Sequence, residues 1–275
     1  MDANPAGVGI PERAEGIPQA APAATRESVT HEQSRQDVPI GPDAPVLGIM
    51  STTRAMRHLS PEPVPDELIR TLVEAATWAP TGSNAQGEAF VVVTDRATIA
   101  RLASLWRRVT DEFRMLMSAA VPGGAVTPAQ VRIRDSVDYQ RDHFAETPVI
   151  VVACYDQREV ARAARNPIRV AAAVAPKVGL RRTARLFRAW PTVAQRSEAA
   201  SIYPAVENLL LAARAHGLGA CLTTWHLLAE AEFKEILGIP SGVETFAVIP
   251  IGWPLGHFGP VRRGPVEDVI HHDRW

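Results

Sequence analysis

The chain has 275 residues, of which 46% are hydrophobic and 6% aromatic, and its formal net charge at pH 7 is −1. This composition is ordinary for a globular protein of one large domain or two small ones. A net charge near zero disfavours partners chosen by bulk charge, such as nucleic acid or an anionic membrane surface. No run reaches the roughly 18 apolar residues of a membrane-spanning helix, so we expect no membrane partner.

The two cysteines, Cys154 and Cys221, each lie within an apolar run. Such positions are typical of buried reduced thiols rather than of a disulfide framework. The first residues lack the charged and apolar regions of a secretory signal. These features together predict a cytoplasmic protein.

Residues 1–45 contain seven prolines, seven acidic and three basic side chains, and no aromatic residue. Such a segment buries too little apolar surface to offset the entropy of ordering. We therefore predict a disordered tail over 1–45, followed by one domain over 46–275. The tail is interpreted as a dispensable leader, with an arm that embraces a second subunit or binds another partner as the alternative.

Apolar periodicity predicts the following helices and strands in chain order: helix 65–79, strand 89–94, helices 95–119 and 127–144, strand 148–154, helices 201–216 and 229–237, and strand 243–251. The helix over 201–216 has the clearest apolar stripe, and Gly217 supplies its stop. Few strands and long helices in non-alternating order predict an α+β domain with a central, mainly antiparallel sheet flanked by helices.

Several common enzyme motifs are absent: G-x-G-x-x-G after a strand, the P-loop, H-E-x-x-H and G-x-S-x-G. The run Gly217–Ala220 follows a helix instead of opening one, so we interpret it as a helix C-cap. The eight histidines are scattered, and no metal site is expected.

Two segments carry side chains suited to a polar ligand. Arg54 and Arg57 lie three residues apart at the end of a short amphipathic stretch. Both guanidinium groups can therefore face one side and bind a phosphate. Asn84 and Gln86 each bring one acceptor and two donors to the loop over 79–86. The alternatives are a solvated helix face for the arginines and simple turn geometry for the loop.

The loop Ala79-Pro80-Thr81-Gly82-Ser83-Asn84-Ala85-Gln86 resembles the AP(S/T)G(S)NxQ loop of the FMN-dependent nitroreductase family. Two more segments agree with that family in the same order. They are Thr52-Thr53-Arg54-Ala55-Met56-Arg57 upstream, and Pro250-Ile251-Gly252-Trp253-Pro254 followed by Arg262-Arg263 downstream. The resemblance covers about Val46 to Trp275 apart from one insert, and its three ordered motifs make coincidence improbable.

The resemblance implies a nitroreductase-like α+β fold in an intertwined homodimer, with FMN as cofactor and NADPH or NADH as electron donor. The implied contacts to the FMN phosphate and ribityl chain are Arg54, Ala55, Arg57, Arg262 and Arg263. Those to the isoalloxazine edge and ribityl hydroxyls, often across the dimer interface, are Thr81, Ser83, Asn84 and Gln86. A backbone N–H near Thr224 or Trp225 is implied to donate to flavin N5.

The sequence departs from the family pattern at three places. Thr53 replaces an arginine, Ala55 replaces a serine, and Gly87-Glu88 stands where proline and tryptophan are frequent. The first two changes remove one charge and one hydroxyl, so phosphate binding must depend more on the remaining arginines. No catalytic acid or base is assigned, and His226 is interpreted as a surface residue.

The activity implied is ping-pong hydride transfer through flavin N5, from NAD(P)H to a nitroaromatic, a quinone or a similar conjugated small molecule. Two alternatives stay open. One is an FMN-dependent oxidase or dehydrogenase of a biosynthetic intermediate, and the other is a flavin-binding protein without turnover.

A basic insert occupies about 156–196. Between Arg158 and Arg196 it carries ten basic residues and one acidic residue. It is interpreted either as a lid whose arginines attract an anionic substrate or the extra phosphate of NADPH, or as a solvated helical pair. Phe187 and Trp190 are its stacking aromatics, and no nucleic-acid-binding module is recognisable, so no nucleic-acid partner is expected.

Overall fold

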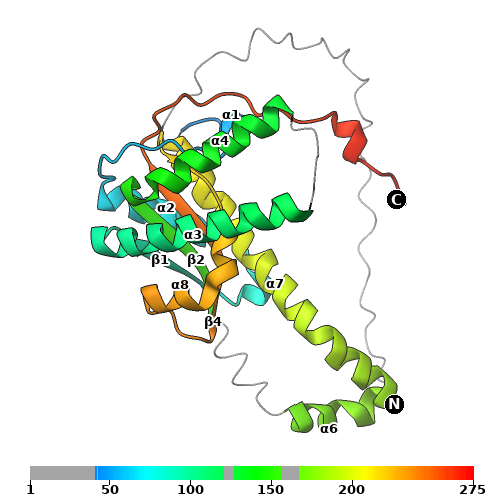
Figure 1. The fold of residues 1–275 in the computed structure, drawn as a ribbon. Coiled ribbons are helices and arrows are strands. Elements are labelled where there is room, and N and C mark those ends of the chain that lie inside the picture. Colours follow the sequence, from blue (N-terminus) through cyan, green and yellow to red (C-terminus); the bar gives the residue numbers. More distant parts are fainter. Residues whose placement is uncertain (1–40, 42, 121–126, 157–166) are drawn as a thin grey trace, which may run out of the picture. The chain divides into compact units, whose positions relative to one another are not determined.

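The computed structural model describes residues 41, 43–120, 127–156 and 167–275 (Figure 1). They fall within one unit that spans residues 37–275. Most of the predicted tail, residues 1–40 and 42, lies outside the described residues. The backbone N–H of Gly41 donates to the carbonyl of Ala215 at 2.7 Å. The predicted division between tail and domain at residue 45 stays a prediction.

Four strands form one antiparallel sheet in the order β1-β2-β4-β3. The strands are β1 (Glu88–Val93), β2 (Val149–Asp156), β3 (Gly219–Ala220) and β4 (Val243–Gly252). The helices are α1 (Val46–Thr52), α2 (Asp66–Thr77), α3 (Arg96–Ala120), α4 (Pro128–His143), α6 (Pro167–Val178), α7 (Leu180–Ala215) and α8 (Glu230–Leu237). Short 3₁₀ turns cover Gly82–Asn84, Phe144–Glu146, Trp225–Ala229 and Val266–Val269.

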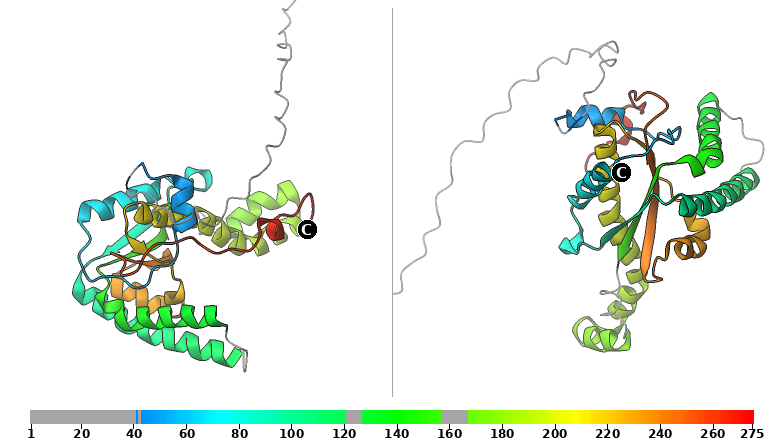
Figure 2. Two further views of the ribbon diagram at one scale, coloured as in Figure 1. Left: turned by 90° about the horizontal axis from the view of Figure 1, so that it is seen from above. Right: turned by 90° about the vertical axis from the view of Figure 1, so that its left-hand side faces the viewer.

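The central strand β2 is buried on both faces, and its successive side chains point alternately into two separate hydrophobic cores. Val149 and Val151 pack into a core with α2 and α7, whereas Ile150 and Val152 pack into a second core with α3 and α8. This is the period-2 geometry of a strand. Figure 2 shows the resulting layers, with helices on both sides of the sheet. The predicted α+β class with a central antiparallel sheet is therefore confirmed.

Helix α7 is longer than predicted, because it begins at Leu180 rather than near residue 201. Its second half has the predicted stripe, with Ile202, Ala205, Val206, Leu209 and Ala213 buried. Gly217, at a φ of +77°, ends it as predicted. The first half faces solvent and contains a proline, Pro191. Without an apolar stripe against the core, the pattern gave no signal for it.

The basic insert contains α6 and the first half of α7, and residues 157–166 of it lie outside the described part of the chain. Every basic side chain between 167 and 196 is exposed. Helix α6 packs against α7, at the end of α7 that lies away from α1 (Figure 1). The described part of the insert thus has the exposed basic side chains expected of a solvated helical pair.

No helix over residues 43–120, 127–156 or 167–275 has the length and hydropathy needed to cross a membrane.

Candidate functional site

The two ends of the domain run side by side, because residues 253–261 pair in antiparallel fashion with residues 51–60. Backbone N–H groups of Leu255 and Val261 donate to the carbonyls of His58 (3.0 Å) and Ser51 (2.9 Å). In the same stretch, Nη2 of Arg54 donates to the carbonyl of His257 at 2.6 Å. The structure therefore places the first motif directly beside the segment that leads into Arg262.

A pocket of about 420 Å³ opens where this paired segment meets α4. Arg54, Ala55 and Arg57 line it, together with Met56, His58, Gly256 and, from α4, Ala129, Arg132, Ile133 and Ser136. The lining residues include three arginines and no acidic residue. Within the described part of the chain, none of the three forms an ion pair. Like charges gathered without a counter-ion attract an anion.

A smaller pocket of about 160 Å³ adjoins the first one at Arg57. It brings together Arg57, Thr224 and Trp225, with Trp106, Val137, Gln140, Leu222 and Thr223 completing the wall. The Trp225 ring stacks on Phe113 and Trp106, with centroids 4.4 and 5.9 Å apart. The structure thus brings the motif that ends at Arg57 together with Thr224 and Trp225, about 170 residues further along the chain.

The side chain geometry of the arginines differs from the expectation in two respects. Arg54 and Arg57 do not share a helix face, because α1 ends at Thr52 and the chain continues in extended form. Arg262 and Arg263 are exposed and line neither pocket, and Nη1 of Arg263 donates to the carbonyl of Arg262 at 2.9 Å. The backbone pairing of residues 51–60 with residues 253–261 is what brings the two segments together.

The polar loop lies apart from both pockets within one chain. Ser83, Asn84 and Gln86 are exposed, and all three have positive φ, at +55°, +53° and +48°. Thr81 holds this turn, because its Oγ1 accepts from the backbone N–H of Gln86 at 3.1 Å. Non-glycine residues in this region are strained, and such strain concentrates at functional sites.

Gly87 follows the loop where a bulkier residue is frequent in the family pattern. A Cβ at this position would lie 2.7 Å from Cζ of Tyr155, whose side chain is 8% exposed. The Tyr155 ring therefore fills the space beside the loop, and glycine is required for that packing.

His226 is not the surface residue that we predicted. Its side chain is 1% exposed and lies against Phe233, with ring centroids 4.8 Å apart. Neither ring nitrogen has a hydrogen-bond partner among the described residues. Burial lowers the pKa of His226 to about 4. The imidazole is therefore neutral at pH 7 and part of the core, which the sequence did not reveal because its neighbours lie in a 3₁₀ turn without apolar periodicity.

Both cysteines are buried free thiols, as predicted. Burial raises the pKa of Cys154 to about 11 and also raises the pKa of Cys221. Cys221 lies behind the smaller pocket, where its Sγ accepts a hydrogen bond from Nε2 of Gln140 at 3.1 Å. Neither sulfur is a reactive thiolate at neutral pH.

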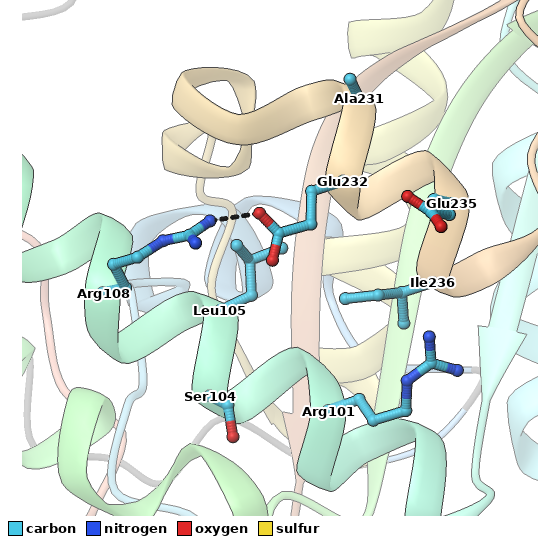
Figure 3. A pocket seen from close by; sticks show the side chains of 8 residues that line it. All are labelled: Arg101, Ser104, Leu105, Arg108, Ala231, Glu232, Glu235 and Ile236. Carbon is cyan, nitrogen blue, oxygen red and sulfur yellow. Dashed lines mark hydrogen bonds and ion pairs between the residues drawn. The ribbon is translucent and has the colours of Figure 1, made fainter.

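A larger pocket of about 840 Å³ lies between α3 and α8 (Figure 3). It is lined by two arginines and two glutamates, and Arg108 already pairs with Glu232 across it. Its charges are balanced, and it contains none of the residues of the three motifs. In the described residues no group of three or more His, Cys, Asp or Glu side chains could hold a metal.

Gly219 packs against the segment that carries Arg54 and Arg57. A Cβ at Gly219 would lie 2.9 Å from Cδ2 of Leu59 and 3.0 Å from Cβ of Met56. We expect Gly219→Ala to displace this segment and to lower the free energy of unfolding by about 1–3 kcal/mol. Urea denaturation measures the change, and an unaltered midpoint would contradict the packing described here.

These features define an α+β protein with an arginine-lined pocket beside the pairing of residues 51–60 with residues 253–261. The nitroreductase family model matches residues 50–253. A relative described as NADH dehydrogenase, from Thermus thermophilus, is 28% identical over 225 residues, which are 79% of this chain and 90% of the relative. A putative NADH dehydrogenase/NAD(P)H nitroreductase of Archaeoglobus fulgidus is 24% identical, over 83% of this chain and 98% of the relative.

Solved structures agree in fold. Iodotyrosine deiodinase bound to FMN and 3-iodo-L-tyrosine has a TM-score of 0.58 at 16% identity, covering 84% of this chain and all (100%) of that chain. A nitroreductase with bound FMN from Desulfitobacterium hafniense has a TM-score of 0.53 at 18% identity, covering 82% and 97%. The chain belongs to the nitroreductase family.

Proposed function

We propose that this chain is an FMN-dependent oxidoreductase that takes electrons from NADH or NADPH and passes them to a nitroaromatic, a quinone or a similar conjugated acceptor. The observation that carries the proposal is the 420 Å³ pocket in which Arg54 and Arg57 meet without a counter-ion. Family membership over residues 50–253 gives that pocket its context.

The donor set fits FMN. Guanidinium groups match phosphate oxygens in charge and in planar fork geometry. Arg54 and Arg57 would hold the phosphate, with Arg262 and Arg263 able to add charge from the neighbouring segment. Ala55 offers only its backbone, so the phosphate depends on the arginines. When bound, FMN supplies a ring that accepts a hydride equivalent from one substrate and delivers it to another.

The chain's own residues would bind the cofactor, orient its ring and shield it from water. Thr224 and Trp225 lie on the wall next to Arg57, where a backbone N–H can orient the ring. The stacked Trp225, Trp106 and Phe113 make that wall rigid and exclude water. His226 is buried, neutral at pH 7 and packed against Phe233, so it is not assigned as an acid or base.

The polar loop supports a homodimer as part of the proposal. Thr81, Ser83, Asn84 and Gln86 line neither arginine pocket within one chain. A second copy of the chain would bring its own loop to the ring edge, where the amide groups of Asn84 and Gln86 can read carbonyl and N–H groups. The buried free thiols favour a reducing compartment, so we propose a cytoplasmic location.

One experiment tests the function. The chromophore of the purified protein is released and identified by mass, and its reduction by NADH and by NADPH is followed without oxygen. We expect FMN, bleaching by at least one nicotinamide, and recovery of colour on adding a nitroaromatic or a quinone. Bleaching by neither nicotinamide would favour the oxidase or dehydrogenase, and a protein that cannot be loaded with FMN would exclude both enzymes.

A further inference from the structure

Arg132 lies on α4, outside all three sequence motifs, yet its side chain lines the same pocket as Arg54 and Arg57. The residues of α4 that line the two pockets recur at helical spacing and so form one face of the helix: Ala129, Arg132, Ile133, Ser136, Val137 and Gln140. This face turns Arg132 toward the arginine-bearing segment.

Helix α4 is held in place at several points. The Tyr139 ring stacks on His58, with centroids 3.8 Å apart, and Gln140 donates to Cys221. On the other side, Nη1 of Arg141 lies 2.7 Å from Oδ1 of Asp111 in α3. Because α4 is fixed both to the segment over 54–58 and to α3, the position of Arg132 at the pocket is set by the fold.

Neighbouring charges do not compensate Arg132. The nearby carboxylate Asp135 pairs with Arg134, which lines neither pocket. Arg132 itself forms no ion pair or hydrogen bond with any residue over 43–120, 127–156 or 167–275. Three positively charged arginines around one pocket repel each other. A bound dianion would attract all three and so offset this repulsion.

We propose that Arg132 is a phosphate-binding residue, which acts with Arg54 and Arg57 on the phosphate of FMN. The proposal deepens the proposed function and rests on it. Thr53 stands where the family pattern has an arginine, so the segment Thr52–Arg57 lacks one positive charge. Arg132 on α4 would compensate for that missing charge. The pocket is larger than a phosphate group alone requires, which leaves room for the chain that carries the phosphate.

The test compares FMN with riboflavin, which lacks the phosphate, by titration of the flavin-free protein with fluorescence readout. Arg132→Ala is expected to weaken FMN binding roughly 5- to 50-fold and to leave riboflavin binding within about 2-fold of the wild-type value. The FMN effect should shrink at high salt, since Arg132 is exposed. Arg134→Ala is the matched control on the same helix, and it should leave both affinities unchanged.

Each outcome decides the proposal. Unchanged FMN affinity in Arg132→Ala, while the wild-type chain binds FMN, would overturn the role of Arg132 and leave the proposed function intact. Equal losses for FMN and riboflavin would also overturn it, because the effect would then not involve the phosphate. A lowered preference for NADPH over NADH without any change in FMN affinity would assign Arg132 to the nicotinamide instead. A wild-type chain that binds neither flavin would overturn the proposed function as well.

Discussion

Purified Arg57→Ala protein is expected to bind FMN roughly 10- to 150-fold more weakly than the wild-type chain. Arg57 lines both pockets of the candidate site, so it is the one motif residue that an occupant of either pocket meets. Its charge also reaches the buried Cys221, where it acts to lower the thiol pKa against the effect of burial. Removal of this side chain takes away the one arginine among the described residues that lines both pockets, and Arg54 and Arg132 remain at the larger of the two only.

The effect of Arg57 is measured by the flavin content of the purified protein and by titration with FMN. Arg57→Lys keeps the charge but loses the planar fork, and we expect an intermediate affinity. Arg107→Ala, an exposed arginine on α3 that lines no pocket described here, is the control. Full flavin occupancy in Arg57→Ala would show that the phosphate is bound elsewhere.

The stability of the protein is expected to fall between about pH 6.5 and pH 4 because of His226. Burial lowers its pKa from 6.5 to about 4. In this window the unfolded chain takes up a proton that the folded chain does not, so the free energy of unfolding decreases as the pH falls. The shift corresponds to about 3 kcal/mol, and no further loss from this residue follows below both pKa values.

His226→Leu isolates this contribution. The variant lacks the titrating group, so the difference in unfolding free energy between variant and wild type should grow by about 3 kcal/mol from pH 7 to pH 4. Acid-sensitive groups that do not interact with His226 are common to both proteins and cancel. The charges of Glu230 and Lys234 act on the pKa of His226 in opposite directions and are smaller than the effect of burial. At pH 7 the variant should be as stable as the wild type or more so, because two unpaired buried nitrogens are removed. Parallel pH profiles would show that His226 is not buried.

The local elements were largely predictable because their patterns are periodic. The predicted strands at 89–94, 148–154 and 243–251 correspond to β1, β2 and β4 within one or two residues at each end, and Gly217 ends α7 as expected. The exposed half of α7 and the short strand β3 were missed. Neither has a repeating apolar pattern, since the first faces solvent and the second has two residues.

The site was predictable only in part. The motifs identified Arg54, Arg57, Thr224 and Trp225, which the structure places on the walls of two adjoining pockets. They could not identify Arg132, because an arginine beside other charges on a polar helix has the pattern of a solvated residue. The prediction that His226 lies at the surface was wrong, because its side chain packs against Phe233 of α8.

The sequence by itself determined strands β1, β2 and β4, most of the helices and the family, because these depend on apolar periodicity and on short motifs whose residues are close together in the chain. The tertiary structure decided which charges meet. Pairing of residues 253–261 with 51–60, and packing of α4 across them, join segments that no local pattern connects. Contacts between distant segments depend on the shapes of the packed elements, and those shapes exist only once the chain has folded.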